Sequence, residues 1–227
     1  MKISQATISL LQSFSNISGN LLVKPGSKLI TRNAVNSVQA RAVVEEKFPT
    51  QFAIYDLSQF LALLAVSVDP DIEFSDRSME ITSASGGVIK YYYADPSLIQ
   101  SPTDNEPTLE THFKFSLSSA DINVIHKTAA IVSATMLSIV AEDGKAVLCI
   151  NDPKNASSNT YKQQLGECDL DFDVRMSIDN FRVVPDAYDI SIAHAVGKSG
   201  AKALVFFLSS TSRTLTYLIA ADTTSKL

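Results

Sequence analysis

The landmarks of the first half of the chain recur in the second half, about 115 residues later. A repeat of this length has the size of a whole domain. The paired landmarks are Ser4 and Ser119 at the start of an amphipathic helix, Phe52–Asp56 and Val174–Ser177 in a strand that enters a second helix, and Tyr91–Asp95 and Tyr217–Asp222 in a closing strand that ends in an acid. The repeat predicts two α+β domains of like topology, each with antiparallel strands and two helices on one side.

A polar segment with two prolines, Gln100–Pro107, separates the two halves. It contains no apolar side chain, which is typical of a linker between domains. We therefore predict an N-terminal domain over residues 1–105 and a C-terminal domain over residues 106–227.

Apolar residues at helical spacing predict three helices, while the runs Asn20–Val23, Lys28–Arg32 and Val38–Val44 predict strands. Each helix has a residue at its start that can cap it, namely Ser4, Asp56 and Ser118. A short fourth helix is expected after Ser177. The apolar stripes are Ile3, Thr7, Leu10, Leu11 and Phe14; Leu57, Phe60, Leu61 and Leu64; and Ile122, Ile125, Ala129 and Val132.

The balance of charge argues against a sequence-specific DNA-binding protein. The chain has 19 Lys and Arg against 24 Asp and Glu, a net charge of −5, and no basic stripe. It has no apolar run of the ~20 residues that a membrane helix needs and no signal-peptide pattern. Two cysteines, Cys149 and Cys168, are too few for a disulfide framework or a zinc site. We expect a reduced protein that contacts no membrane.

Three patterns could carry chemistry, and each has a simpler structural explanation. Gly197-Lys198-Ser199 lacks the earlier glycine of a phosphate-binding loop and precedes a strand, so a surface hairpin is predicted. Asp169, Asp171 and Asp173 alternate, so on one strand their carboxylates would share a face and could hold a divalent ion; a charged edge strand explains them equally well.

The three histidines, His112, His126 and His194, are scattered along the chain and none stands at metal-ligand spacing. His126 is predicted on the polar face of the third helix. No Gly-x-Ser-x-Gly elbow offers a serine nucleophile, and Cys149 and Cys168 lack a neighbouring base or cation run that would lower a thiol's pKa. The chain is therefore predicted to be an assembly or binding module rather than an enzyme, with no cofactor and no metal.

Several segments resemble the sliding clamps of T-even-type phages. The strand and helix at Phe52–Leu64 carry the strongest likeness, and it extends in order and spacing along essentially the whole chain. The other matching segments are the first helix with Leu10, Leu11 and Phe14, then Ile30–Arg32, Ala94–Ser97 and Tyr217–Thr223.

The resemblance implies a DNA-clamp fold, in which two similar domains of antiparallel sheet carry helices on the inner face and assemble as a ring. It implies a homotrimer that encircles double-stranded DNA nonspecifically and holds a DNA polymerase on it. A clamp loader ATPase would open the ring, and late-transcription factors are further expected partners. The place of action would be the cytoplasm of the infected bacterial host.

This role predicts which surfaces face DNA and partners. We expect the polar helix faces to line the ring, through Lys2, Gln5, Gln12, Asn123, His126, Lys127 and Arg182. Few of these residues are cations, so the grip on DNA should be weak. A pocket for a partner's peptide is expected at Tyr93, Leu98, Leu218 and Ala220. The alternatives are a phage structural protein with duplicated α+β domains and a metal-dependent nuclease that uses Asp169, Asp171 and Asp173.

Overall fold

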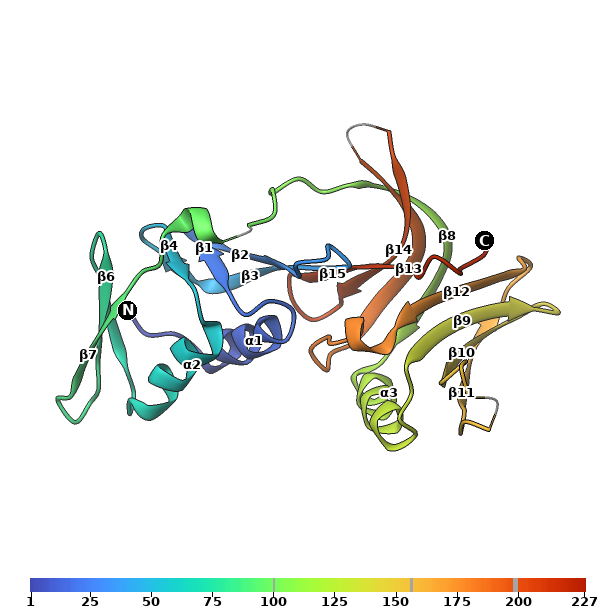
Figure 1. Cartoon of the computed structure of the whole chain (residues 1–227), viewed down its shortest axis with the longest axis horizontal. Coiled ribbons are helices and arrows are strands. Elements are labelled where there is room, and N and C mark those ends of the chain that lie inside the picture. The colour runs from blue at the N-terminus through green and yellow to red at the C-terminus, as the bar shows by residue number, and fades with distance from the viewer. Residues whose placement is uncertain (100, 156, 198–199) are drawn as a thin grey trace. The chain divides into compact units, whose positions relative to one another are not determined.

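The chain divides into two compact units, Met1–Asp104 (unit 1) and Asn105–Leu227 (unit 2). A computed structural model describes residues 1–99, 101–155, 157–197 and 200–227 (Figure 1). Gln100 of the predicted linker and Lys198 and Ser199 of the predicted hairpin lie outside the described residues. No helix among the described residues is long and apolar enough to cross a membrane.

Unit 1 contains two α-helices and seven strands among its described residues. In chain order they are α1 (Gln5–Ser15), β1 (Leu21–Val23), β2 (Gly26–Arg32), β3 (Val38–Phe48), β4 (Phe52–Ile54), α2 (Leu57–Val66), β5 (Asp71–Phe74), β6 (Ser78–Thr82) and β7 (Val88–Tyr92), followed by a 3-10 turn, η1 (Pro96–Leu98). The antiparallel groups are β1 with β4, β2 with β3, and the three-stranded sheet β5-β6-β7.

The two helices of unit 1 contact each other (Figure 1), and the apolar stripe of each is buried. Helix α1 buries Thr7, Leu10, Leu11 and Phe14, and its N-cap Ser4 accepts the Thr7 backbone N–H. Helix α2 buries Leu57, Phe60, Leu61 and Leu64, and Asp56 caps it by accepting the Gln59 N–H at 2.8 Å. Both predicted stripes are confirmed, because capping residues and 3.6-residue periodicity are local signals.

A buried carboxylate fastens the start of α1 to β3. The register between β2 and β3 shifts so that Gly26 faces Phe48 while Lys28 faces Val43. Glu46 lies in this irregular stretch and is 8% exposed. Its carboxylate accepts the Ser4 backbone N–H at 2.5 Å and the Thr7 hydroxyl at 2.6 Å. The anion therefore satisfies a donor at the positive end of the helix.

Unit 2 contains one α-helix and eight strands among its described residues. They are β8 (Thr108–Leu117), α3 (Ser119–Ile131), β9 (Met136–Glu142), β10 (Lys145–Asn151), β11 (Tyr161–Glu167), β12 (Phe172–Ser177), a 3-10 turn η2 (Ile178–Asn180), β13 (Tyr188–Val196), β14 (Lys202–Ser210) and β15 (Leu215–Ala220). The strands form two antiparallel groups, in the orders β11-β10-β9-β12 and β15-β14-β13-β8.

The core of unit 2 lies between these two groups of strands. Apolar side chains from both groups line one small cavity of about 10 Å³. They come from β8, β9, β10, β12, β13 and β14, and Phe181 closes the set. Helix α3 contacts β8 and β10 and adds the buried Ile122, Ile125 and Ala129. Because inner and outer positions alternate along each strand, the other face remains polar or half-buried.

The second helix of unit 1 has only a 3-10 turn as its counterpart in unit 2. Residues 178–180 form η2, where the sequence predicted a short helix carrying Ile178 and Phe181. Pro185 has no backbone N–H and disfavours helical geometry at Val184. Val183 and Val184 are also β-branched, which lowers their helix propensity. The helix therefore ends after one turn.

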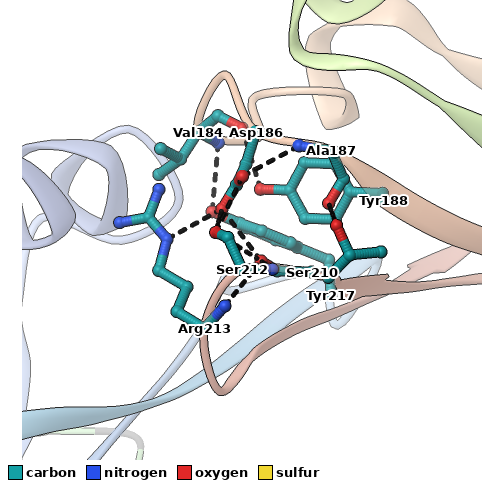
Figure 2. A network of polar contacts seen from close by, with 9 residues as sticks. Val184, Asp186, Ala187, Tyr188, Ser210, Ser212, Arg213 and Tyr217 are labelled. Carbon is teal, nitrogen blue, oxygen red and sulfur yellow. Dashed lines mark hydrogen bonds and ion pairs between the residues drawn. The ribbon is translucent and has the colours of Figure 1, made fainter.

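Asp186 joins the connection after η2 to the hairpin between β14 and β15 (Figure 2). Its carboxylate accepts the hydroxyls of Ser210 and Ser212 at 2.8 Å and the Arg213 guanidinium at 2.9 Å. Nearby, the Tyr188 hydroxyl donates to the Val184 carbonyl. Burial opposes ionisation of Asp186. The hydrogen bonds that its carboxylate accepts outweigh burial and hold the pKa of Asp186 below its ordinary value.

Candidate nucleic-acid interface

The solvent face of α1 carries amides and hydroxyls instead of charges. The exposed residues of this face are Gln5, Ser9 and Gln12, and they lie on the side of the helix away from the buried stripe. No acidic residue lies in the first turn and no basic residue in the last. This face can donate and accept hydrogen bonds but adds no positive potential for phosphates.

Lys2, just before α1, is exposed and forms an ion pair with Asp69. The N-terminal ammonium group of Met1 is paired in the same region, with Asp71 at 2.5 Å. Hydrogen bonding to this ammonium is the largest cause that lowers the pKa of Asp71. Both cations therefore have a carboxylate partner, so a phosphate would have to compete with it.

Helix α3 begins with the predicted capping box. The Ser118 side chain accepts the Asp121 N–H, and the Asp121 carboxylate accepts the Ser118 N–H at 2.8 Å. Hydrogen bonds from Ser118 are the main causes that lower the pKa of Asp121. Lys127 and Asn123 are exposed on this helix, and the Asn123 amide donates to the Ser119 carbonyl of its own first turn.

His126 differs from the predicted surface histidine, because it is half-buried. Its Nε2 lies 2.9 Å from the Phe181 carbonyl, and the two rings meet edge to face with centroids 5.6 Å apart. Burial lowers the pKa of His126, and the bond to Phe181 opposes this shift. A neutral ring held against Phe181 is better suited to joining α3 to η2 than to binding phosphate.

Arg182 follows η2 and is half-exposed, but its charge is also engaged. Its Nε donates to the Asp179 carbonyl and its guanidinium pairs with the Asp179 carboxylate, both at 3.0 Å. Of the three cations predicted to face DNA, Lys2 and Arg182 are ion-paired. A solvent-exposed pair of this kind is worth about 0–1 kcal/mol, so exchange for a phosphate costs little.

The four residues of the predicted peptide pocket are divided between the units. Tyr93 and Leu98 belong to unit 1, where the Tyr93 ring packs on Phe52 at 5.5 Å and Leu98 is 61% exposed. Leu218 and Ala220 lie on β15 of unit 2, where Leu218 packs against the small buried cluster of Ala193, Ala195 and Val205. Neither unit gathers all four.

The three alternating aspartates do not share a strand face. Strand β12 begins at Phe172, so only Asp173 lies on it, while Asp169 and Asp171 are exposed residues of the preceding turn. The Asp173 carboxylate is bonded to Arg175 Nε at 2.8 Å. The described residues contain no group of three or more His, Cys, Asp or Glu side chains that could hold a metal ion. The prediction that the three carboxylates share one strand face is wrong, because Asp169 and Asp171 lie in the turn before β12.

Two of the three histidines, which are scattered in sequence, meet in the fold. His112 Nε2 and His194 Nδ1 lie 2.8 Å apart, although 82 residues separate them in sequence. The two cysteines are not paired: Cys168 is buried, and burial raises the pKa of the Cys149 thiol. A raised pKa disfavours the reactive thiolate.

Two curated phage proteins are similar to the chain along most of its length. It is 27% identical over 206 residues to the sliding clamp of Vibrio phage KVP40, covering 88% of this chain and 93% of that protein. It is 26% identical over 209 residues to the sliding clamp of Enterobacteria phage T4, covering 88% and 90%. A scan against protein-family models found no match.

Among solved structures, the proliferating cellular nuclear antigen of Entamoeba histolytica matches with a TM-score of 0.66 at 13% identity, over 95% of this chain and 94% of that one. The chain therefore has the DNA-clamp fold. Fold and relatives together support its assignment to the sliding clamps of T-even-type phages.

Proposed function

We propose that this relative of the phage sliding clamps forms a homotrimeric ring that encircles duplex DNA and tethers the phage DNA polymerase for processive replication. The observation that carries the proposal is that each unit has strand edges with no partner of their own unit, and among them we propose β7 and β11 as the seam; β5, β8 and β12 likewise pair with one strand of their unit. Within its own unit and among the described residues, β7 pairs only with β6 and β11 pairs only with β10. An unpaired edge presents a row of backbone donors and acceptors to another chain.

Two different edges on one chain favour head-to-tail assembly. If β7 of one copy binds β11 of the next, each added copy leaves one edge of each kind free, and the series ends only when a ring closes. The side chains near the edges are mixed rather than purely apolar. Val88, Lys90 and Tyr92 are exposed on β7, while Lys162, Gln164 and Glu167 are exposed on β11. Such a seam is compatible with a ring that must open.

The helix faces support a loose hold on DNA. Strong nonspecific binding requires many unpaired cations, since each neutralised phosphate contributes to affinity. The faces of α1 and α3 offer amides and the exposed Lys127, and the nearby cations Lys2, before α1, and Arg182, after η2, already have acidic partners. The net charge of −5 on the whole chain does not prevent a loose hold on DNA, because salt screens charges beyond about 8–10 Å. The proposed grip is therefore topological, and weak contacts permit sliding.

The partners follow from the proposed role. A clamp loader ATPase would open the ring in the cytoplasm of the infected bacterium, and late-transcription factors would use the same ring as a tether. The polymerase peptide would dock through Tyr93, Leu98, Leu218 and Ala220, which include half-buried and exposed apolar side chains of both units. The ring itself would supply no catalytic group and need no cofactor.

Sedimentation velocity over a range of concentrations tests the ring. A trimer that dissociates on dilution is the expected result. Tyr92→Asp on β7 places a charge beside the proposed seam and should shift the equilibrium toward monomer, whereas Ser85→Asp in the nearby exposed turn should not. A monomer at every concentration, or equal dissociation of both variants, would contradict the proposed seam.

Primer extension on circular DNA tests the tether. With loader and ATP, the chain should lengthen the products that the polymerase makes in one binding event. On a linear template with free ends a sliding ring escapes, so the stimulation should fall. Equal stimulation on both templates would indicate a direct effect on the polymerase instead of encirclement.

A further inference from the structure

Two imidazole rings face each other on neighbouring strands of unit 2. His112 on β8 and His194 on β13 are both half-buried, their centroids are 4.8 Å apart, and their planes are nearly perpendicular at 89°. The nearest ring nitrogens are Nε2 of His112 and Nδ1 of His194, at 2.8 Å. One nitrogen must carry the proton and the other must accept it.

A β-bulge lies at this pair. Phe113 faces Ile192 and Thr111 faces Ala193, so His112 is the extra residue on β8. In the register that holds at His194, Glu110 faces His194, and alternation along β8 puts His112 on the same face of the sheet as Glu110. Bulges of this kind redirect a side chain and are common beside functional sites. The strand therefore departs from regular pairing at the one residue that completes the pair.

The spacing of the two nitrogens is close to that of two ligands on one metal ion. In a tetrahedral zinc site each imidazole nitrogen lies about 2.0–2.1 Å from the metal, which puts two of them about 3.3 Å apart. The rings would need to separate by about 0.5 Å to admit an ion in place of the shared proton. The rings would also have to turn, because two nitrogens that share a proton point at each other, whereas two ligands of a tetrahedral ion point at the ion from different directions.

A carboxylate and an ammonium group lie next to the histidine pair. Glu110 faces His194 across the strands, and its carboxylate accepts from Lys202 Nζ at 2.6 Å. That hydrogen bond is the largest cause that lowers the pKa of Glu110, and the charges of His194 and His112 contribute further. The carboxylate is thus within electrostatic range of both rings and would favour a cation between them.

We propose that His112 and His194 form a binding site for a divalent transition-metal ion such as Zn²⁺ or Ni²⁺. The ion binds His112 Nε2 and His194 Nδ1, and water fills its remaining positions. Neutral imidazole suits these borderline metals, whereas Mg²⁺ and Ca²⁺ prefer oxygen ligands. The donor ring moves its proton to its other nitrogen as the ion binds, so two neutral rings remain. The bound metal ion cross-links β8 to β13.

Calorimetric titration of the full chain with Ni²⁺ and with Zn²⁺ tests the site. One ion per chain is expected, and His112→Gln and His194→Gln should each weaken binding by at least about tenfold. Cys149→Ser controls for thiol binding and should bind like the wild type, as should His126→Gln. Equal affinity in the wild type and both pair variants, or no one-to-one binding at millimolar metal, would overturn the proposal.

Proton NMR of the unaltered chain gives a second measurement that does not depend on whether a variant folds. Addition of Zn²⁺ should shift the ring signals of two histidines and leave those of His126 in place. Shifts confined to His126, or no shift in any ring, would count against the site. Lys202→Gln frees Glu110 from its ion pair, so it should keep or strengthen metal binding; a loss would contradict the role given to the carboxylate.

Discussion

The carboxylate of Glu46 accepts the backbone N–H of Ser4 across 42 residues of sequence, at 2.5 Å. The bond lies at the start of α1, whose outer face is proposed to line the ring. With its second oxygen on the Thr7 hydroxyl, Glu46 fixes both the cap and the first turn. The orientation of the α1 surface therefore depends on a buried side chain that never meets DNA.

Replacing Glu46 by Gln should destabilise the protein by about 1–3 kcal/mol, because the amide leaves one buried donor without an acceptor. Urea unfolding followed by circular dichroism measures the change. Glu45→Gln is the matched control, since Glu45 is the exposed neighbour and surface substitutions usually stay within about 0.5 kcal/mol. Equal effects of the two variants would remove the role assigned to Glu46.

Stability should fall in acid partly through Glu46. Burial raises its pKa, but the bonds from Ser4 and Thr7 outweigh burial, so the folded-state pKa lies below the ordinary value of 4.5. A lowered folded-state pKa contributes stability above the unfolded-state pKa, and this contribution is lost as pH falls through the folded-state pKa. Wild type should therefore lose more stability below about pH 4.5 than Glu46→Gln does; parallel pH profiles would contradict this.

Asp186→Ala should cost more than Asp189→Ala. Asp186 accepts from two serines, Arg213 and the Ala187 backbone, so its loss leaves several donors without a partner, at about 1–3 kcal/mol for the first buried one. Asp189 is exposed and accepts from Ser116. Thermal unfolding compares the two variants. Loss of Asp186 should also increase hydrogen exchange at the hairpin between β14 and β15.

Adding charge to α1 should tighten the hold on DNA. The double variant Gln5→Lys, Gln12→Lys places two unpaired cations on the exposed face, and each phosphate contact adds about 0.9 to the slope of log affinity against log salt. Retention on circular DNA, measured over a salt series, should become greater and more salt-dependent. Ser85→Lys with Thr214→Lys adds the same charge at exposed turns outside the helices and should have little effect.

Reversing the charge of Lys2, Lys127 and Arg182 together should reduce loader-dependent retention on circular DNA. Two of these cations already have acidic partners, so the reduction should be modest at physiological salt and larger at low salt, where screening is weak. Retention that is unchanged at both salt concentrations would remove all three from the DNA-facing surface.

Elements that depend on neighbours in sequence could be predicted before the structure. The stripes of α1 and α2 follow from local periodicity, and the caps Ser4, Asp56 and Ser118 follow from the residue type at the start of each helix. The shortened helix at η2 also had a local cause in Pro185, but its apolar spacing alone suggested a longer element.

Features that depend on pairing between distant strands could not be predicted in this way. His112 meets His194 because β8 lies beside β13 in a register that sets Glu110 opposite His194. Asp169 and Asp171 alternate with apolar residues as a strand would, yet β11 ends at Glu167 and β12 begins only at Phe172, so both lie in the connection between these strands. The hydrophobic pattern of one strand does not specify its register with a distant strand or the geometry of the turn beside it.

In the proposed ring, a seam between β7 and β11 has a consequence for mixed populations of chains. A copy with only its β11 edge blocked could still join a neighbour through β7, and would then end the series without closing it. If half the copies in a cell carried such a block, only about one in eight random triplets would contain none. A defect at one edge would therefore reduce the number of closed rings by more than the fraction of chains that carry it.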